Sequence, residues 1–224
     1  MITSAHNPRL KLIRRLLESR RQREKERLFV CEGEDLVDAA RAAGIAPVEL
    51  LVAGEDVDSA LVAELSTLGH PPRVIGVYRS ADLPKATRDV VLALWRVSDP
   101  GNVGTLLRTA DAFGAGVSLS AECADPLGPR ALRASAGAIF RVPLIAWGDM
   151  PEPPVALVAH DGEPLADATL EAPLTFLLGS EREGLSDEVV AQASRVSIPT
   201  PGDAESLNVA AAGAIALYEL SRRR

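Results

Sequence analysis

Three polar segments in the second half of this chain carry residue types that bind ligands and stabilise charge. They are Asp99–Gly104 with Arg108 beyond it, Gly179–Leu185, and Ile198–Val209. Glycines in all three segments allow the backbone to approach a bound molecule closely. In a parallel α/β sheet, ligands bind beyond the carboxyl ends of the strands, so we expect the three segments to meet at one site.

The first segment combines glycines with two polar side chains. Arg108 offers a planar guanidinium to a phosphate or to a developing alkoxide. Asn102 has a plainer alternative role, which is to cap the helix that follows. The glycine spacing is not Gly-x-Gly-x-x-Gly, and no acidic residue stands clearly at the next strand end. A nicotinamide-binding dehydrogenase is therefore a poor match.

The other two segments also bring polar groups to the ends of apolar runs. In the second, two glycines bracket Ser180–Glu183 directly after an apolar strand, which a surface turn would also explain. The third is rich in proline and glycine and delivers Ser206 and Asn208 to the start of a helix expected over residues 205–222. Asparagine is a poor residue for a helix interior, so Asn208 calls for an explanation of its own.

The elements that must position these segments alternate between strand and helix. We expect strands at residues 90–97, 116–120, 142–146, 155–160, 174–178 and 195–199, and helices at 102–113, 129–139, 186–193 and 205–222. Such alternation predicts a parallel sheet covered on both faces.

The first 80 residues form a separate α/β pattern. We expect helices at residues 10–27, 33–43 and 57–68, and strands at 28–31, 48–53 and 73–78. The polar stretch 79–88 contains Pro84 and has no clear periodicity, which marks a domain junction. We therefore expect a small domain over residues 1–84 and a larger one over residues 85–224.

The N-terminal helix carries an unusual charge. Nine basic and three acidic residues between Arg9 and Arg27 leave a net +6, whereas the whole chain carries −7. A positive arm on an acidic body is typical of a phosphate-binding segment, although a solvated helix face with pairs such as Arg20–Glu24 is the plain alternative. The residues that we expect to bind RNA are Arg9, Lys11, Arg14, Arg15, Arg20 and Arg21.

The overall composition limits the function classes. Only 4% of the 224 residues are aromatic, which disfavours a protein that stacks a row of RNA bases. Cys31 and Cys123 form no metal-binding pattern with the three histidines, so we expect reduced thiols and no metal. No apolar run approaches the roughly 20 residues of a membrane helix, and no signal peptide is recognisable. We expect a cytoplasmic protein.

Taken together, the three segments resemble the motifs of the SpoU-type (TrmH-like) RNA 2′-O-ribose methyltransferases of the SPOUT superfamily. The resemblance covers residues 90–222. Residues 1–84, with Asn7-Pro8 and Phe29-Val30-x-Glu32-Gly33, resemble less specifically the small substrate-binding domain that such enzymes often carry. The matching motifs are Asp99-Pro100-x-Asn102-x-Gly104-x-x-x-Arg108-x-Ala110, Gly179-Ser180-Glu181-x-x-Gly184-Leu185 and Ile198-Pro199-x-x-Gly202-x-x-Glu205-Ser206-Leu207-Asn208-Val209.

The resemblance implies a fold, a cofactor and an assembly. The fold is a parallel sheet with a deep trefoil knot at its C-terminal end, formed by the second and third segments. These segments hold S-adenosylmethionine, and the enzymes are usually homodimers. The implied cofactor contacts are Leu178, Gly179, Ile198, Ser206, Leu207 and Val209. The implied catalytic residues are Arg108, Asn102, Glu181, Ser206 and Asn208.

The resemblance leaves the RNA substrate open. The additional N-terminal domain favours ribosomal RNA, and a transfer RNA is the alternative within the same chemistry. An antibiotic-resistance enzyme acting on the ribosome is a variant of the first interpretation. A non-catalytic RNA-binding protein on the same scaffold is a different class, and the complete set of implied catalytic residues argues against it.

Overall fold

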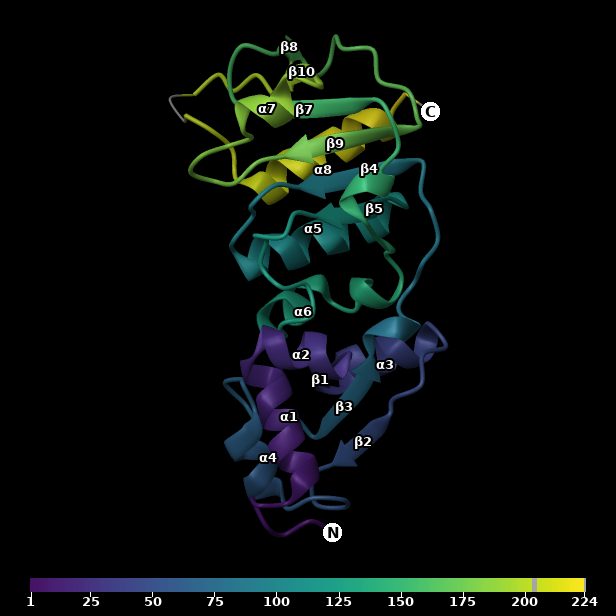
Figure 1. The fold of residues 1–224 in the computed structure, drawn as a ribbon, viewed down its shortest axis with the longest axis vertical. Coiled ribbons are helices and arrows are strands. Elements are labelled where there is room, and N and C mark those ends of the chain that lie inside the picture. Colours follow the sequence, from purple (N-terminus) through teal and green to yellow (C-terminus); the bar gives the residue numbers. More distant parts are fainter. Residues whose placement is uncertain (203–204, 224) are drawn as a thin grey trace.

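The computed structural model describes residues 1–202 and 205–223, and its two β-sheets lie in different halves of an elongated molecule (Figure 1). The N-terminal half contains three strands, which pair antiparallel in the order β1-β3-β2. Their bounds are β1 (Leu28–Glu32), β2 (Glu49–Val52) and β3 (Val74–Arg79). The sequence predicts all three strands to within a residue or two at each end.

The basic N-terminal segment forms two helices, α1 (Pro8–Glu18) and α2 (Arg20–Glu26), so the prediction of a single helix over residues 10–27 is wrong. Ser19 has extended backbone, with φ −131° and ψ 117°, and its hydroxyl accepts a hydrogen bond from the Gln22 N–H. A serine that caps one helix in this way ends the helix before it. The half is completed by α3 (Glu34–Ala42), α4 (Ser59–Leu65) and the single turn η1 (Ser80–Asp82).

A seven-stranded sheet forms the C-terminal half, with the strand order β6-β5-β4-β9-β7-β10-β8. Every neighbouring pair is parallel, which confirms the predicted α/β architecture. The knot implied by the resemblance stays a prediction. The strands are β4 (Val90–Leu94), β5 (Gly116–Leu119), β6 (Leu144–Ile145), β7 (Pro154–Val158), β8 (Glu163–Pro164), β9 (Leu174–Leu178) and β10 (Ser194–Ser197).

The helices of this half correct three sequence predictions. The helix α5 (Pro100–Phe113) is capped by the carboxylate of Asp99 rather than by Asn102. The helix expected over residues 129–139 stops at Ser135, because Ala136 and Gly137 have left-handed backbone. The closing helix begins at Val209, not at residue 205. These elements are α6 (Pro129–Ser135), η2 (Ala138–Phe140), η3 (Trp147–Asp149), α7 (Asp187–Val190) and α8 (Val209–Ser221).

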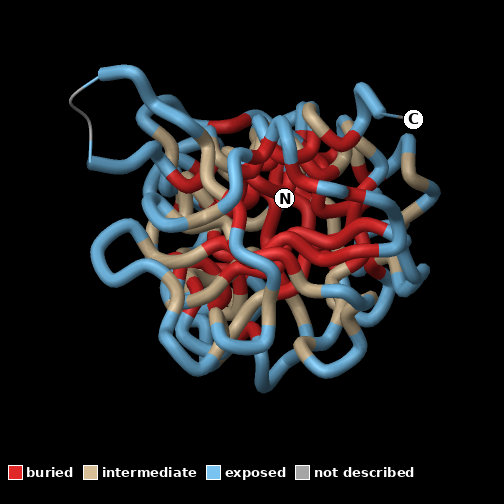
Figure 2. Tube along the Cα trace, turned by 90° about the horizontal axis from the view of Figure 1, so that it is seen from above, coloured by how far each residue is buried: buried red, intermediate tan, exposed pale blue. Residues whose placement is uncertain are grey.

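The seven-stranded sheet is covered on both faces, and Figure 2 shows the buried strands surrounded by exposed loops. One face packs against α5 and α8. Gly213 of α8 lies so close to α5 and the sheet that a Cβ there would stand 2.5 Å from the side chain of Leu106 in α5 and 3.3 Å from that of Leu178 in β9. The opposite face, which includes Ala93 and Leu177, packs against Trp147 and the residues around α7. The core therefore holds the carboxyl ends of β4 and β9 in a fixed register.

The two halves share one apolar core. Phe140 of η2 inserts against Phe29 of β1 and Tyr78 of β3, with ring centroids 6.0 Å and 5.4 Å away. Gly137 packs so closely on Ala39 of α3 that a Cβ would stand 2.3 Å from the Ala39 methyl carbon. Among the described residues, no helix is long and apolar enough to cross a membrane.

Candidate active site

A cavity of about 420 Å³ opens beyond the carboxyl ends of β7, β9 and β10. This is the edge at which a parallel α/β sheet binds its ligands. The residues that line it come from the loops after these three strands and from the first turn of α8. All six residues predicted to contact a cofactor lie in its lining: Leu178, Gly179, Ile198, Ser206, Leu207 and Val209.

Glycine shapes the loop that forms one wall of the cavity. The N–H groups of Ser180 and Gly184 each donate to the carbonyl of the other, at 3.2 Å and 3.0 Å, so the loop closes into a tight turn. A Cβ at Gly179 would stand 2.2 Å from the carbonyl carbon of Gly184, and Gly184 has a φ of 66°. A larger residue at Gly179 would force the loop to move, whereas at Gly184 the space is open and a larger residue would strain the backbone. The two glycines of the second segment are therefore explained by its closure.

The lining suits a ligand with an apolar part and a positive charge. Leu157, Leu178, Ile198 and Val209 are among its apolar residues, beside the backbone of the glycine-containing loops. Among the described residues of the lining, the charged side chains are three carboxylates, Glu181, Glu183 and Glu205, and one guanidinium, Arg182. S-adenosylmethionine combines a nucleoside with a sulfonium cation, so this set of residues fits that group.

Three predicted catalytic residues form one hydrogen-bonded chain beside the cavity. The Nδ2 of Asn208 donates to Oδ1 of Asn102 at 3.1 Å, and Nδ2 of Asn102 donates to Oε1 of Glu181 at 2.5 Å. Each residue comes from a different polar segment. The three segments therefore meet at one place, as their position after the strands predicts. Ser206 also lies in the lining.

Asn208 fixes the direction of this chain because it is also the N-cap of α8. Its Oδ1 accepts hydrogen bonds from the N–H groups of Ala210 and Ala211, at 2.9 Å and 3.3 Å. With its oxygen occupied, the amide must turn its N–H₂ toward Asn102, which in turn must direct its own N–H₂ toward the carboxylate. The unexpected asparagine is therefore a helix cap and not, as the sequence predicts, an interior residue of a helix over residues 205–222.

Arg108 stands apart from the other four predicted catalytic residues. It lies on α5, its side chain is exposed, and it does not line the cavity. Within residues 1–202 and 205–223 it makes no ion pair and no side-chain hydrogen bond. A side chain that binds a phosphate of an incoming RNA must be free of other partners, as Arg108 is among the described residues. The fold by itself does not bring Arg108 into the hydrogen-bonded chain of Asn208, Asn102 and Glu181.

Sequence reasoning missed several residues around the site. Arg96, two residues beyond the end of β4, has a left-handed φ of 56° and forms ion pairs with Glu122 and with Glu183, the latter at 3.0 Å. It thereby joins the loops after β5 and β9. His160 and Thr200 line the cavity as well. The position of Arg96 at a strand end was a usable signal, whereas nothing in the sequence marks His160.

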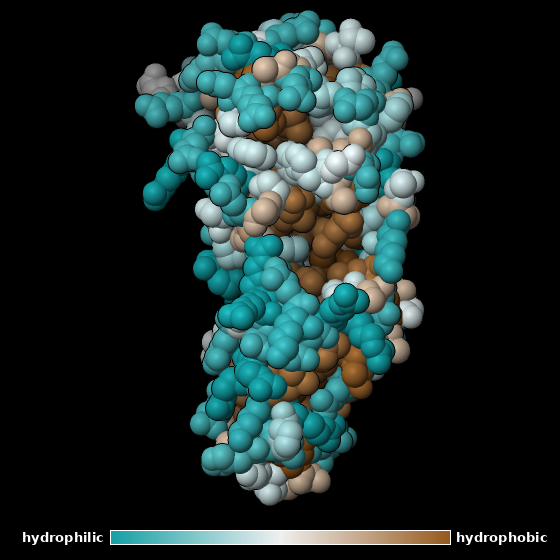
Figure 3. Space-filling model, in the orientation of Figure 1, coloured by the Kyte–Doolittle hydropathy of each residue, from teal (hydrophilic) through white to brown (hydrophobic). Residues whose placement is uncertain are grey.

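The basic residues of α1 and α2 are only partly available to a ligand. Hydrophilic side chains cover these helices in Figure 3. Lys11, Arg15 and Arg21 are exposed and Arg14 is half-buried. Arg9 pairs with Glu49, and Arg20 pairs with Glu24 and donates to the carbonyl oxygen of Cys123 at 2.9 Å. The Arg20–Glu24 pair is the one that the sequence suggests.

Comparison with family profiles accounts for both halves of the chain. The SpoU rRNA Methylase family matches residues 89–218, which is more than half of the chain. An MRM3-like substrate binding domain matches residues 7–81. The two ranges lie on either side of the boundary expected at residues 84 and 85, which itself stays a prediction.

Individual proteins resemble the chain over its whole length. It is 30% identical to the 23S rRNA (guanosine(2553)-2′-O)-methyltransferase RlmP of Bacillus subtilis, covering 98% of both chains. It is 31% identical to an uncharacterised tRNA/rRNA methyltransferase of Synechocystis, covering 100% of this chain and 94% of that protein.

Solved structures extend the likeness to three dimensions. The AdoMet-bound rRNA methyltransferase of Sinorhizobium meliloti matches with a TM-score of 0.86 and 29% identity, over 99% of this chain and 97% of the other. The AdoMet complex of AviRb, a SpoU methyltransferase from Streptomyces viridochromogenes, matches with a TM-score of 0.87 and 26% identity over 98% of each chain. With the family profile, the full-length relatives and the meeting of its three motif loops in agreement, this chain belongs to the SpoU family of RNA methylases.

Proposed function

We propose that this protein transfers a methyl group from S-adenosylmethionine to a ribose 2′-hydroxyl of ribosomal RNA. The observation that carries the proposal is the chain Asn208–Asn102–Glu181 beside an acidic cavity of about 420 Å³. A non-catalytic RNA-binding protein has no need for three motif loops joined through oriented side chains at such a cavity. Leu178, Gly179, Ile198, Ser206, Leu207 and Val209 would hold the cofactor.

The substrate class rests on relatives that share both halves of the chain. The methyltransferases from Bacillus subtilis and Sinorhizobium meliloti match over 98% and 99% of this chain, and their names specify rRNA. A structure described for the 2-OH methylation of C/U34 on tRNA matches only 60% of this chain, with a TM-score of 0.56. The N-terminal half, proposed to be a substrate-binding domain over residues 1–84, therefore favours ribosomal RNA. A ribosomal substrate also favours the cytoplasm as its place of action.

The chemistry requires an oriented oxygen and stabilised charge. When bound, S-adenosylmethionine supplies a methyl group that is already activated for in-line attack, so positioning contributes most of the rate. Asn102 and Asn208 keep the Glu181 carboxylate at a defined place. Glu181 is the only carboxylate among the five predicted catalytic residues, so it can accept a hydrogen bond or a proton from the 2′-hydroxyl. Ser206 would complete the wall of the site.

Arg108 is proposed to bind the target phosphate and to stabilise the developing alkoxide. A guanidinium stays protonated at neutral pH, which excludes it as a proton acceptor. Replacing Arg108 by lysine keeps the charge but removes the planar fork, so we expect kcat to fall by roughly 10²-fold or more. Unchanged kcat in Arg108→Lys, with normal cofactor binding, would remove Arg108 from this role.

The proposed homodimer would form through the exposed side of α8. Ile215 and Tyr218 are 38% and 56% exposed, an unusual exposure for large apolar side chains on the same helix as a buried face. The helix packs against α5, which carries Arg108, and it begins at the cavity. A dimer through this side would bring two copies of the site close to the interface.

The proposed function is tested with ribosomal RNA from a strain that lacks the gene. The purified protein is incubated with this RNA and with S-adenosylmethionine that carries an isotopically labelled methyl group. The RNA is then digested, and its nucleosides are analysed by mass spectrometry. We expect one labelled 2′-O-methylnucleoside, at substoichiometric enzyme and in proportion to the RNA added.

Transfer RNA from the same strain, incubated in parallel, serves as the substrate control. Label in transfer RNA alone would replace ribosomal RNA with transfer RNA as the substrate. Label on a base instead of a ribose would refute the 2′-hydroxyl as the acceptor. Absence of label in any RNA, together with no calorimetric binding of S-adenosylmethionine, would leave the non-catalytic interpretation.

A further inference from the structure

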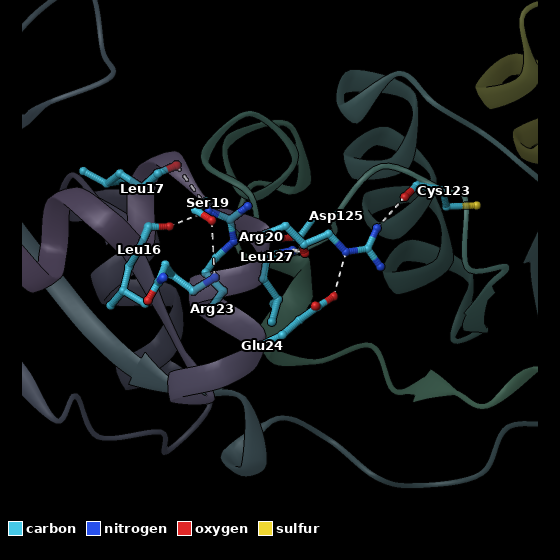
Figure 4. Close-up of polar contacts among 10 residues, drawn as sticks. Leu16, Leu17, Ser19, Arg20, Arg23, Glu24, Cys123, Asp125 and Leu127 are labelled. Carbon is cyan, nitrogen blue, oxygen red and sulfur yellow. Dashed lines mark hydrogen bonds and ion pairs between the residues drawn. The ribbon is translucent and has the colours of Figure 1, made fainter.

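Arg23 differs from every other basic residue of the N-terminal helices because it is buried. Only 7% of its surface is exposed, and its guanidinium lies beside the carbonyl groups of Leu16 and Leu17 at the end of α1 (Figure 4). Its Nε donates to Oδ2 of Asp125 at 2.7 Å. Its Nη1 donates to the carbonyl oxygens of Leu16 and Leu17, the latter at 3.2 Å.

The partners of Arg23 belong to two separate elements. Leu16 and Leu17 lie in the last turn of α1, whose carbonyl groups lack partners within the helix and attract a positive charge. Asp125 lies in the loop before α6, in the C-terminal half, and its other oxygen accepts from the N–H of Leu127 at 2.9 Å. A single planar group thus holds the end of α1, the start of α2 and this loop in one arrangement.

The other contacts between the two halves define the orientation of one half relative to the other less strictly than the Arg23–Asp125 pair does. Phe140 packs against Phe29 and Tyr78, and Gly137 packs against Ala39, and such apolar contacts have little directional preference. Arg20 adds one directional contact to the carbonyl oxygen of Cys123, but its side chain is 45% exposed. The buried Arg23–Asp125 pair is therefore the directional contact least weakened by solvent.

The loop before α6 leads directly to the site. Its helix α6 sits on α5 at Gly104, where a Cβ would stand 2.4 Å from the carbonyl oxygen of Ala131. The first turn of α5 carries Asn102 of the hydrogen-bonded chain. The contact made by Arg23 is thus separated from the site only by two helices packed without a gap.

We propose that Arg23 is a positioning residue, which fixes the N-terminal half relative to the methyl-transfer site so that bound RNA presents its ribose correctly. The inference rests on the proposed function, because it assigns RNA binding to that half. It separates the basic residues into two groups: exposed ones that contact RNA, and one buried residue that orients the domain carrying them.

The test compares Arg23→Lys, Asp125→Asn and the double variant with the parent protein. Lysine keeps the charge, but one ammonium group cannot reach all three acceptors with the fork geometry of arginine. In both single variants we expect kcat/KM for ribosomal RNA to fall by roughly tenfold to a hundredfold. The Kd for S-adenosylmethionine should stay within about twofold, and the double variant should lose little more than either single one, because both remove the same contact.

Arg41→Lys is the matched control, because Arg41 pairs with Asp38 on the surface of the same half at 71% exposure of its side chain. This variant should keep the parent kcat/KM. The proposal is overturned if folded Arg23→Lys retains the parent kcat/KM for RNA, if its cofactor Kd weakens in parallel, or if the two single effects simply add.

A second readout does not depend on activity. Hydrogen exchange of the free protein should become faster in residues 123–128 and in α2 of Arg23→Lys, while residues 174–178 of β9 remain as protected as in the parent. Unchanged exchange in residues 123–128 would overturn the positioning role even for a protein that methylates no RNA. Faster exchange there without any methyl transfer by the parent would refute the proposed function alone.

Discussion

Asn208 performs two tasks with one amide group. Its oxygen caps α8, and its nitrogen donates to Asn102. The two tasks use different atoms, so substitutions can separate them. Capping by asparagine or aspartate contributes about 1 kcal/mol to helix stability, and aspartate preserves it without a donor group.

We therefore expect Asn208→Asp to fold with nearly the parent stability but to lose most of its methyltransferase activity. The carboxylate repels Glu181 and cannot donate to Asn102. Asn208→Ala should additionally lose about 1 kcal/mol in the free energy of unfolding. Urea denaturation and kcat measured on the same preparations separate the two effects. Equal activity in Asn208→Asp and the parent would show that the donor is dispensable.

The hydroxyl group of Tyr78 lowers the stability of the folded protein. Its side chain is fully buried, and its hydroxyl finds no hydrogen-bond partner among the described residues. Burial raises the pKa of Tyr78 to about 12, and the neighbouring Cys31 adds to this shift. Burial also raises the pKa of the Cys31 thiol well above its usual range. Both side chains are therefore protonated in the folded protein at neutral pH.

We expect Tyr78→Phe to raise the free energy of unfolding by about 1 kcal/mol, because it removes a buried hydroxyl without a partner. The pH dependence follows from linkage. An unfolded tyrosine ionises near pH 10, so the stability held by the neutral form is present below that pH and is lost as pH rises toward 12. Chemical denaturation at pH 8 and pH 11 should show a smaller decline in Tyr78→Phe than in the parent. An equal decline would assign the alkaline loss to other groups.

At the scale of the element, the basic N-terminal segment is a pair of helices with different surfaces. The break at Ser19 turns α2 relative to α1, so Arg23 is buried against Asp125 and the partly exposed Arg20 reaches the carbonyl oxygen of Cys123. Arg15 and Arg21 stay exposed and are among the residues that we propose to bind RNA. A variant that also reversed the charge of Arg20 would disturb the contact between the halves. Its effect on RNA binding could then not be separated from its effect on that contact.

We expect the triple variant Arg14→Glu, Arg15→Glu and Arg21→Glu to bind RNA weakly and with a reduced dependence on salt. Loss of three phosphate contacts should flatten the slope of log K against log salt by about two to three. The Kd for S-adenosylmethionine should not change, because the cavity is distant from these helices in the fold. Filter binding over a range of salt concentrations gives the slope. An unaltered slope would remove these three residues from the RNA-binding surface.

At the scale of the whole molecule, the exposed side of α8 is the surface through which we propose that two copies associate. Ile215 and Tyr218 are three positions apart and lie on the same side of the helix. The opposite side of α8 is buried through Gly213 and Leu217. One face of α8 thus packs in the core, and the opposite face is the proposed dimer interface.

We expect Ile215→Asp combined with Tyr218→Glu to convert the protein to a monomer, because two carboxylates meet their symmetric copies in an apolar interface. Sedimentation velocity across a concentration series measures the change. The parent should sediment as a dimer of about twice the 23.7 kDa chain mass. A parent protein that remains monomeric at high concentration would contradict the proposed assembly.

Local sequence patterns predict much of the secondary structure of this protein. Strand β9 follows from the apolar run Leu174–Leu178, and α5 ends at Gly114 as the sequence predicts, because such features depend on neighbours within a few residues. The three motif segments and their place after strands were likewise evident. Only the tertiary structure decided that Asn102 meets residues 79 and 106 positions away, and that Arg23 is buried while Arg21 is exposed. Both depend on how distant surfaces pack, and neither the type of a side chain nor its local spacing contains that information.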